Sequence, residues 1–317
     1  MGLKLYLTAL LAAIPLSQCH FAFVRVALNG EWQDPTRFIR NKTEHFEEEW
    51  TPNTNVNWRA YTDPTYATDY PESVRCGRDN MRHAADTEVL KVRGGDFIEV
   101  AHTRPGPENW SEVVWNNCPY ERGSCMNFTG DTELKIMDLN HPGPFIAHLS
   151  RVPEGEDIHT YDGSGDWVKI YTLGMDMTDD VINPIHWLPW NGDRYENGSY
   201  RLPSRIAFNI PKQTPKGQYL LRFDLVNTGV IQPGFTEFPA QLYATCAQIQ
   251  VESDGESEAL PKGVLIPEAL SHFAPGMTTT LTMYRSESLD TDYVYPGGPL
   301  WNGVNYVQDK PVTGVDG

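Results

Sequence analysis

The sequence predicts an all-β protein, an antiparallel β-sandwich with long loops. Three observations favour this fold class: helical periodicity is scarce, segments of alternating polar and apolar residues recur, and clusters of Gly, Pro and Asn separate them. The alternation is clearest in residues 218–225, which read QYLLRFDL. Several strands joined by long, aromatic-bearing loops are typical of sandwiches.

Strand-like segments recur along the chain, each bounded by turn residues. In chain order they are 21–28, 88–101, 144–152, 166–173, 204–210, 218–226 and 240–251. A long irregular region, residues 31–75, carries five aromatic residues, namely Trp32, Trp50, Trp58, Tyr61 and Tyr66. Loops of this length on a sandwich are usually functional, although any one of these rings can instead cover an edge of the core.

The first 19 residues are typical of a secretory signal peptide. An apolar run (residues 5–16) follows a lysine, and Ser17 and Cys19 are small residues at the positions that a signal peptidase reads. The run is shorter than the ~20 residues that span a bilayer. We therefore expect a secreted, extracellular protein that has no membrane segment. The mature protein is expected to begin at His20. A cut a few residues away, or a lipoprotein box ending in Cys19, are the alternatives.

After cleavage we expect one sandwich domain over residues 20–303 and a short loose tail over 304–317. The formal charge of −17 disfavours nucleic acid and anionic membranes as partners, and a neutral polysaccharide is compatible with it. Four cysteines remain, an even number that suggests two disulfides in an exported chain. Zinc is disfavoured because no C-x-x-C pair occurs. Four possible N-glycosylation sites agree with secretion: Asn41, Asn109, Asn127 and Asn197.

A mature N-terminus at His20 offers two nitrogen ligands, the α-amine and the imidazole. One further imidazole completes a three-nitrogen site that suits copper. Among the other histidines, His141 lies in the sequence Asn-His-Pro-Gly-Pro before a predicted strand, where the turn residues fix the backbone. A single loop histidine is more often an exposed surface residue, so this assignment depends on the surrounding sequence.

Short blocks in a fixed order extend this pattern along the chain. They are His20 with Leu28-Asn29-Gly30, Cys76-Gly77, His141-Pro142-Gly143-Pro144, 162–171 (DGSGDWVKIY), Ile210-Pro211, 215–222 (PKGQYLLR), 240–248 (AQLYATCAQ) and 296–301 (PGGPLW). In these blocks the chain resembles the fungal lytic polysaccharide monooxygenases of auxiliary activity family nine, formerly glycoside hydrolase family sixty-one. The resemblance covers residues 20–303, and the order and number of the blocks carry it.

The resemblance implies an immunoglobulin/fibronectin-like sandwich with one copper ion in a histidine brace of His20 and His141. Tyr243 matches the tyrosine near the axial position, and Gln241 matches a glutamine behind the ligands. These two residues lie two apart in a predicted strand, so their side chains share a face, and Cys246 falls on the opposite one. Without the resemblance to the family, the sequence would predict Tyr243 to be a core residue and Gln241 to be a solvent-facing residue.

Two disulfides are also implied by the resemblance. They are Cys76–Cys246 and Cys118–Cys125.

The implied activity is copper-dependent oxidative cleavage of cellulose or a related β-glucan. Reduced copper, with O2 or H2O2, removes hydrogen at C1 and/or C4 of a glucosyl unit. The expected partners are the glucan and an external electron donor, either a small reductant or a redox enzyme, and we expect a monomer. The alternative is a noncatalytic secreted copper-binding or cell-wall-binding protein on the same scaffold.

Two further positions bear on this choice. Gly229 occupies the place of a histidine that family members use to hydrogen-bond oxygen species, which keeps the noncatalytic alternative open. Tyr295, directly before Pro-Gly-Gly-Pro, is our candidate for a ring that lies against the sugar, together with an unspecified aromatic residue of 31–75. The alternative for Tyr295 is that it packs inward against Trp301.

Overall fold

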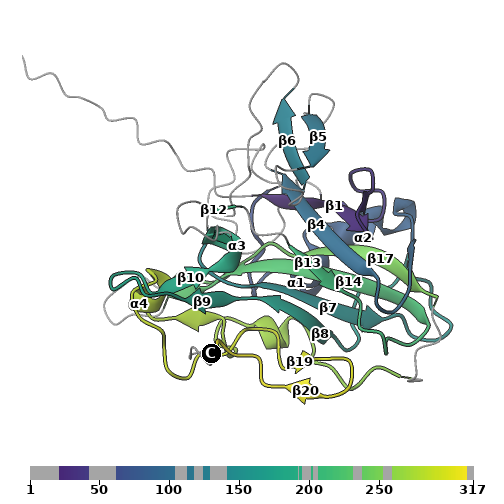
Figure 1. Cartoon of the computed structure of the whole chain (residues 1–317). Coiled ribbons are helices and arrows are strands. Elements are labelled where there is room, and N and C mark those ends of the chain that lie inside the picture. The colour runs from purple at the N-terminus through teal and green to yellow at the C-terminus, as the bar shows by residue number, and fades with distance from the viewer. Residues whose placement is uncertain are drawn as a thin grey trace, which may run out of the picture.

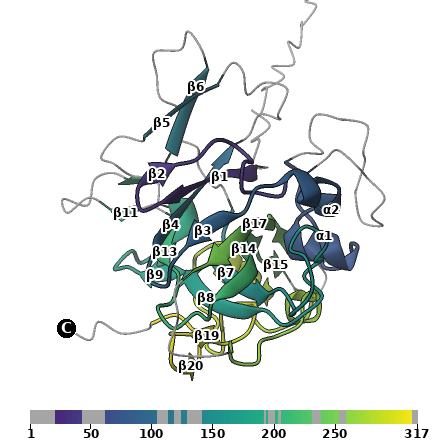
Figure 2. The ribbon, with the colours of Figure 1, turned by 90° about the vertical axis from the view of Figure 1, so that its right-hand side faces the viewer.

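A small and a large β-sheet pack face to face in the computed structural model, with the small sheet above the large one in Figure 1. Figure 2 shows the same two layers turned by 90°. The structure describes residues 21–42, 62–103, 113–117, 124–128, 141–191, 193–194, 201–202, 206–230, 238–252 and 259–312. The arrangement confirms the predicted β-sandwich with long loops.

The small sheet is antiparallel throughout and has the order β13–β4–β1–β2. Its strands are β1 (Ala22–Leu28), β2 (Glu31–Trp32), β4 (Phe97–Thr103) and β13 (Ala207–Asn209). The large sheet has the order β20–β19–β8–β7–β14–β17–β3, and β16 also pairs with β14. Its strands are β3 (Leu90–Val92), β7 (Phe145–Arg151), β8 (Val168–Leu173), β14 (Gly217–Asn227), β16 (Gln241–Leu242), β17 (Thr245–Val251), β19 (Leu300–Trp301) and β20 (Tyr306–Val307).

Most pairings are antiparallel, as predicted, but β3 joins β17 and β19 joins β8 in parallel. Short strand pairs and helices lie outside the two sheets. The pairs are β5 (Val113–Asn117) with β6 (Ser124–Phe128), β9 (Met175–Met177) with β10 (Ile185–Trp187), β11 (Asp193–Arg194) with β12 (Arg201–Leu202), and β15 (Gly229–Val230) with β18 (Thr278–Thr279). The helices are α1 (Pro71–Cys76), α2 (Asn80–His83), α3 (Leu188–Asn191) and α4 (Leu281–Tyr284), with 3-10 turns at Ala84–Asp86 and Glu268–Leu270.

The large sheet is buried on both faces, which explains why β14 is buried along most of its length. Alternate residues such as Phe223 and Leu225 join the core between the sheets. The alternate residues of β14 on its other face point to a second buried layer. This layer is formed by α1 and residues 259–277 together with Trp167. Alternation along a strand thus places Arg222 and Asp224 in a buried layer, where polar groups need partners.

A disulfide joins Cys76, at the end of α1, to Cys246 on β17, with their Cα atoms 4.9 Å apart. This confirms one of the two implied pairs. Arg222, which is cross-strand to Cys246, donates hydrogen bonds to the carbonyl oxygens of Val74 and Arg75 at the end of α1. The helix is therefore held to the sheet by both a covalent bond and a buried guanidinium.

One predicted strand, residues 88–101, is in fact two strands in different sheets. The turn Gly94-Gly95 separates β3 from β4, and Gly95 has φ +94, a conformation that favours glycine. A Cβ at Gly94 would meet the carbonyl oxygen of Lys212 at 2.5 Å. The chain therefore crosses between the sheets at a point where only glycine fits.

The expected loose tail at residues 304–317 is instead ordered over its described part, residues 304–312. Strand β20 pairs with β19 and so adds an edge strand to the large sheet. Behind it, Lys169 Nζ lies 2.8 Å from Asp309 Oδ2, and both side chains are buried. A buried ion pair ties the C-terminal segment to β8. No helix of the described residues is long and apolar enough to cross a membrane.

Candidate functional site

Three predicted site residues meet at one end of the sandwich. Tyr243 Oη lies 2.8 Å from His141 Nε2 and 3.2 Å from Gln241 Oε1. His141 is 8 % exposed and Tyr243 is fully buried, and their rings lie with centroids 5.4 Å apart at 24°. The site therefore brings an imidazole nitrogen and a phenol oxygen side by side in a buried position.

Tyr243 reaches this position because the predicted strand 240–251 breaks there. Strand β16 ends at Leu242 and β17 begins at Thr245. In the break, Tyr243 N donates to Asp224 Oδ1 at 2.6 Å and to the carbonyl oxygen of Leu225.

Asp224 is itself held by Arg222, whose Nη2 donates to Asp224 Oδ2 at 2.6 Å. Both side chains are fully buried. Burial raises the pKa of the Asp224 carboxyl, and the guanidinium opposes that shift. The pair fixes the backbone of Tyr243 from inside the protein.

His141 lies at the start of the loop that leads into β7. A Cβ at Gly143 would meet the carbonyl oxygen of Val226 at 1.8 Å, and Thr228 N donates to the carbonyl oxygen of Pro142. The close approach to β14 that glycine permits holds His141 beside Tyr243, so the Pro-Gly-Pro turn has the positioning role expected from the sequence.

The N-terminal end of β1 also lies at this site. The Phe21 ring stacks on the Tyr243 ring, with centroids 4.3 Å apart and an interplanar angle of 13°. Phe21 is fully buried and also contacts Phe23 and the His102 ring. The first described residue of the chain is therefore part of the wall of the site.

Gln241 has neighbours that sequence reasoning did not connect to it. Asn227 is its partner on β14 and donates from Nδ2 to Gln241 Oε1 at 3.0 Å. Tyr66 forms a side-chain hydrogen bond with Gln241. Burial raises the pKa of the Tyr66 hydroxyl, and this hydrogen bond opposes that shift. Only strand register brings these residues together, so the periodicity of one segment cannot reveal them.

Residue 229, where the resemblance implies a histidine in family members, is closed by the backbone. A Cβ at Gly229 would lie 2.8 Å from Ala240 N and 2.9 Å from the carbonyl oxygen of Phe238. Gly229 N also donates to the carbonyl oxygen of Met277. No larger side chain fits at residue 229 without moving the segment 238–240.

Several predicted positions lie outside the described residues. These are His20, Cys118, Asn109, Asn197, Trp50, Trp58 and Tyr61, and of Asn127 and Cys125 only the strand, β6, is described. Asn41 is described and is half-buried. In the described parts of the chain, no three His, Cys, Asp or Glu residues form a group suited to a metal ion.

The assignment of Tyr295 as a sugar-contacting ring is wrong. Tyr295 is 7 % exposed and packs against Tyr293 in a cluster with Trp187. Its hydroxyl accepts a hydrogen bond from Met175 N at 2.9 Å, and Gly174 leaves room for the ring. A ring held this way has no face free for a sugar, and its partner is the β9 region rather than Trp301.

The loop aromatics that are described do not offer open rings either. Tyr66 is 9 % exposed. Trp32 is half-buried, and the Arg25 guanidinium lies 5.3 Å from its ring centroid. Neither residue supports the expectation of a sugar-stacking platform.

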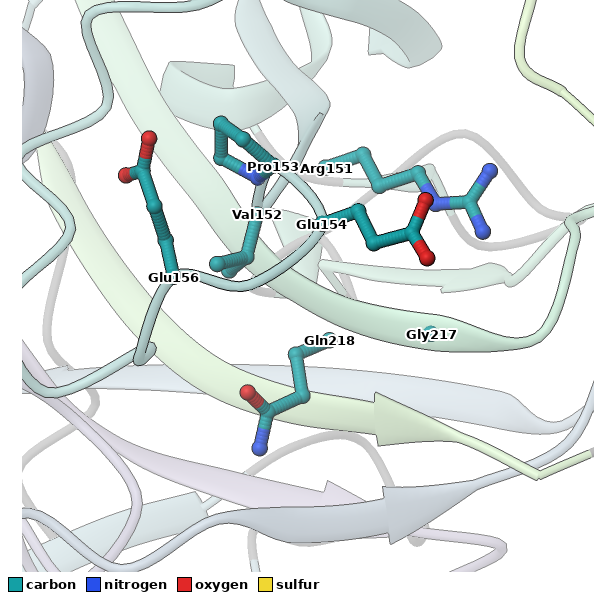
Figure 3. A pocket seen from close by; sticks show the side chains of 7 residues that line it. All are labelled: Arg151, Val152, Pro153, Glu154, Glu156, Gly217 and Gln218. Carbon is teal, nitrogen blue, oxygen red and sulfur yellow. The ribbon is translucent and has the colours of Figure 1, made fainter.

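A cavity of about 630 Å³ lies elsewhere, at the end of β7 and the start of β14. In Figure 3 the side chains of Arg151 and Glu154 extend in the same direction, and Gln218 lies below them. His141 and Tyr243 lie near the opposite ends of these strands, roughly 20 Å away for a seven-residue strand. The cavity is thus separate from the candidate site.

Comparisons with known proteins agree on one family. Residues 20–293 match Auxiliary Activity family 9 (formerly GH61). The AA9 family lytic polysaccharide monooxygenase D of Aspergillus tamarii is 25% identical over 304 residues, which cover 96% of this chain and 88% of the relative. The AA9 family lytic polysaccharide monooxygenase A of Aspergillus fumigatus is 25% identical over 302 residues, covering 95% and 83%.

Solved structures show the same fold. A cellulose-active polysaccharide monooxygenase from M. thermophila superposes with a TM-score of 0.54 at 19% identity, over 90% of this chain and 100% of the other. The extended catalytic domain of H. jecorina LPMO9A gives 0.52 at 18% identity, over 93% and 98%.

Proposed function

The chain belongs to Auxiliary Activity family 9, whose members are copper-dependent lytic polysaccharide monooxygenases, and on that premise we propose that it cleaves cellulose or a related β-glucan oxidatively, at C1 and/or C4. The α-amine and imidazole of His20, together with His141 Nε2, would hold one copper ion. Tyr243 would offer its hydroxyl oxygen beside them, and Gln241 would support that hydroxyl through a hydrogen bond. The protein acts outside the cell as a monomer and takes electrons from a small reductant or a redox enzyme.

The observation that carries this proposal is the pairing of His141 Nε2 with Tyr243 Oη at 2.8 Å, beside Phe21. A peptide bond joins His20 to Phe21, and the Phe21 ring stacks on Tyr243. The residue that follows His20 in the sequence therefore belongs to the same site, which supports an α-amine ligand at residue 20.

The donor atoms fit copper. Imidazole nitrogen with oxygen donors is a ligand set that copper accepts. The Tyr243 hydroxyl has one proton and two acceptors in reach, His141 Nε2 and Gln241 Oε1. With a cation bound at His141 Nε2, Gln241 Oε1 would still accept that proton, and the phenol oxygen would remain available as a donor atom.

Bound copper supplies the redox chemistry that activates O2 or H2O2 and removes a hydrogen atom from the sugar. The protein residues orient and shield that centre. Phe21 and Tyr243 would keep water out of the protein interior next to it, because both are fully buried. The Arg222–Asp224 pair keeps Tyr243 in register with His141.

Copper titration of the mature protein tests the site. We expect one copper per chain, and an extra residue before His20, or His141→Ala, should weaken binding by more than the roughly 10–100-fold that loss of a supporting residue costs. His159→Ala is the control, because this partly exposed histidine pairs with Asp157 elsewhere. Equal affinity and an identical EPR spectrum for the extended protein would rule out the brace. The affinity for copper should also decrease as the pH is lowered, because the amine, with a reference pKa of about 7.7–8.0, must lose its proton to bind the metal.

Product analysis tests the reaction. Copper-loaded protein with a reductant should release oxidised oligosaccharides from cellulose, and without the reductant it should release none. Gly229 is the observation that favours the second candidate, a noncatalytic copper-binding protein. Tight copper binding without oxidised products from any β-glucan would select that candidate, and glucan binding that needs no copper would select a wall-binding protein.

A further inference from the structure

The amide of Gln241 lies between two chain segments that both pair with β16. Asn227 is its register partner on β14. On the other side, Thr65 and Leu242 form an antiparallel bridge with N–O distances of 2.8 and 2.9 Å. In an antiparallel pair the next residue of one strand lies opposite the preceding residue of the other, which sets Tyr66 opposite Gln241 on the same face.

The hydrogen bonds of this amide are directional. Gln241 Oε1 accepts from Asn227 Nδ2 and from the Tyr243 hydroxyl. With its oxygen so occupied, the amide directs its NH2 group to the other side, where Tyr66 forms its side-chain hydrogen bond. An amide held from both ends cannot rotate to exchange its oxygen and nitrogen.

The segment that carries Tyr66 is firmly anchored. Arg78, which is buried, donates from Nη1 to the carbonyl oxygen of Pro64 at 2.6 Å and also donates to the carbonyl oxygen of Asp63. Tyr66 N donates to Asp69 Oδ2 at 2.8 Å. The backbone that carries Tyr66 is therefore held at a fixed place relative to β16.

We propose that Tyr66 is a positioning residue of this site: its hydroxyl orients the Gln241 amide, which in turn holds the Tyr243 hydroxyl beside His141 Nε2. The proposal rests on the proposed function, because it assigns Tyr66 a part in the same centre. The backbone at 238–240 closes residue 229 to any side chain, so the polar support of Gln241 comes from the Tyr66 side and from Asn227.

Tyr66→Phe removes the hydroxyl and keeps the ring. In copper-free protein with ¹³C-labelled tyrosine, we expect the Tyr243 resonance, assigned with Tyr243→Phe, to shift. In copper-loaded protein, kcat should fall roughly tenfold with KM unchanged, the change expected from one hydrogen bond lost near the transition state. Tyr70→Phe is the matched control, since Tyr70 is 48% exposed four residues along the same segment, and it should change neither quantity.

A double-mutant cycle separates positioning from a merely structural role. If Tyr66 acts through Gln241, Tyr66→Phe should have no further effect on kcat in a Gln241→Leu background. An unmoved Tyr243 resonance, an unchanged kcat, or full additivity in the cycle overturns the proposal. If wild-type protein shows no copper-dependent oxidation, the proposed function fails, while the copper-free resonance still decides whether Tyr66 orients Gln241.

Discussion

His148 is a fully buried histidine on the face of β7 that points away from the small sheet. Its Nε2 lies 2.9 Å from the carbonyl oxygen of Gly297 and therefore donates to it. Burial, with Arg222 and Lys169 nearby, lowers the pKa of His148 well below 6.5. The folded protein thus holds this imidazole neutral at a pH at which the unfolded chain takes up a proton.

This difference predicts a loss of stability in acid. Below about pH 6.5 the unfolded state binds a proton that the folded state does not, so the free energy of unfolding should fall as the pH falls, by up to ~1.4 kcal/mol per pH unit. Urea denaturation between pH 7 and pH 4 measures the slope. His148→Gln should make that slope shallower, because it removes the buried imidazole. Equal slopes for wild type and His148→Gln would contradict the prediction.

The sequence placed the side chains of Gln241 and Tyr243 together, and they are hydrogen-bonded. The predicted reason was wrong, because Tyr243 lies in the break between β16 and β17 and not on one strand with Gln241. Tyr66 and Asn227 were missed as neighbours of Gln241, because they meet it only through cross-strand register. Tyr295 was misjudged since a tyrosine before Pro-Gly-Gly reads as a loop residue, and nothing local indicates that residues 259–312 fold back over the large sheet.

Strand β15 approaches the segment 238–240 so closely that its first residue must be glycine. Gly229→Ala should destabilise the fold by about 1–3 kcal/mol, the range for an overpacked site, and Gly229→His should cost more. Thermal denaturation measures both. A stable, more active Gly229→His variant would show that the segment 238–240 yields easily.

Helix α1 depends on the Cys76–Cys246 bond for its attachment to β17. The cysteines are 170 residues apart in sequence, and closing so long a loop stabilises the folded state by on the order of 4–5 kcal/mol in the chain-entropy model. Replacing both cysteines with alanine should lower the free energy of unfolding in urea by that amount. An unchanged midpoint would refute this role. Non-reducing peptide mapping would test the second pair, Cys118–Cys125, which should close a far shorter loop.

Sequence patterns located the central strands and misjudged the connections. Residues 144–152, 166–173 and 218–226 each became one strand because alternating apolar residues fill the core between the sheets. The 88–101 segment has the same pattern but divides between two sheets. The alternating pattern predicts which residues are buried but does not predict in which sheet they lie. It therefore could not predict the crossing between the sheets at Gly94.

At the scale of the whole molecule, the C-terminal segment completes the large sheet. Deleting residues 304–317 removes β20 and leaves Lys169 buried without Asp309, which should cost about 3–5 kcal/mol. Thermal denaturation of the truncated protein measures the loss, and a loose tail would produce none. The double variant Lys169→Met with Asp309→Leu should be far less damaging than Asp309→Ala, since an apolar pair leaves no buried charge without a partner.

The long span of the Cys76–Cys246 bond also determines the order of events during synthesis. At 5–20 residues per second, the ribosome needs roughly 10–35 s to add the 170 residues that separate the two thiols. During that interval Cys118 and Cys125 emerge, so the first oxidation available to Cys76 is a non-native one. A chain in which Cys76 has paired with Cys118 or Cys125 requires thiol–disulfide exchange after β17 has been made. The yield of active protein should therefore depend on the isomerase capacity of the host compartment as well as on its oxidising power.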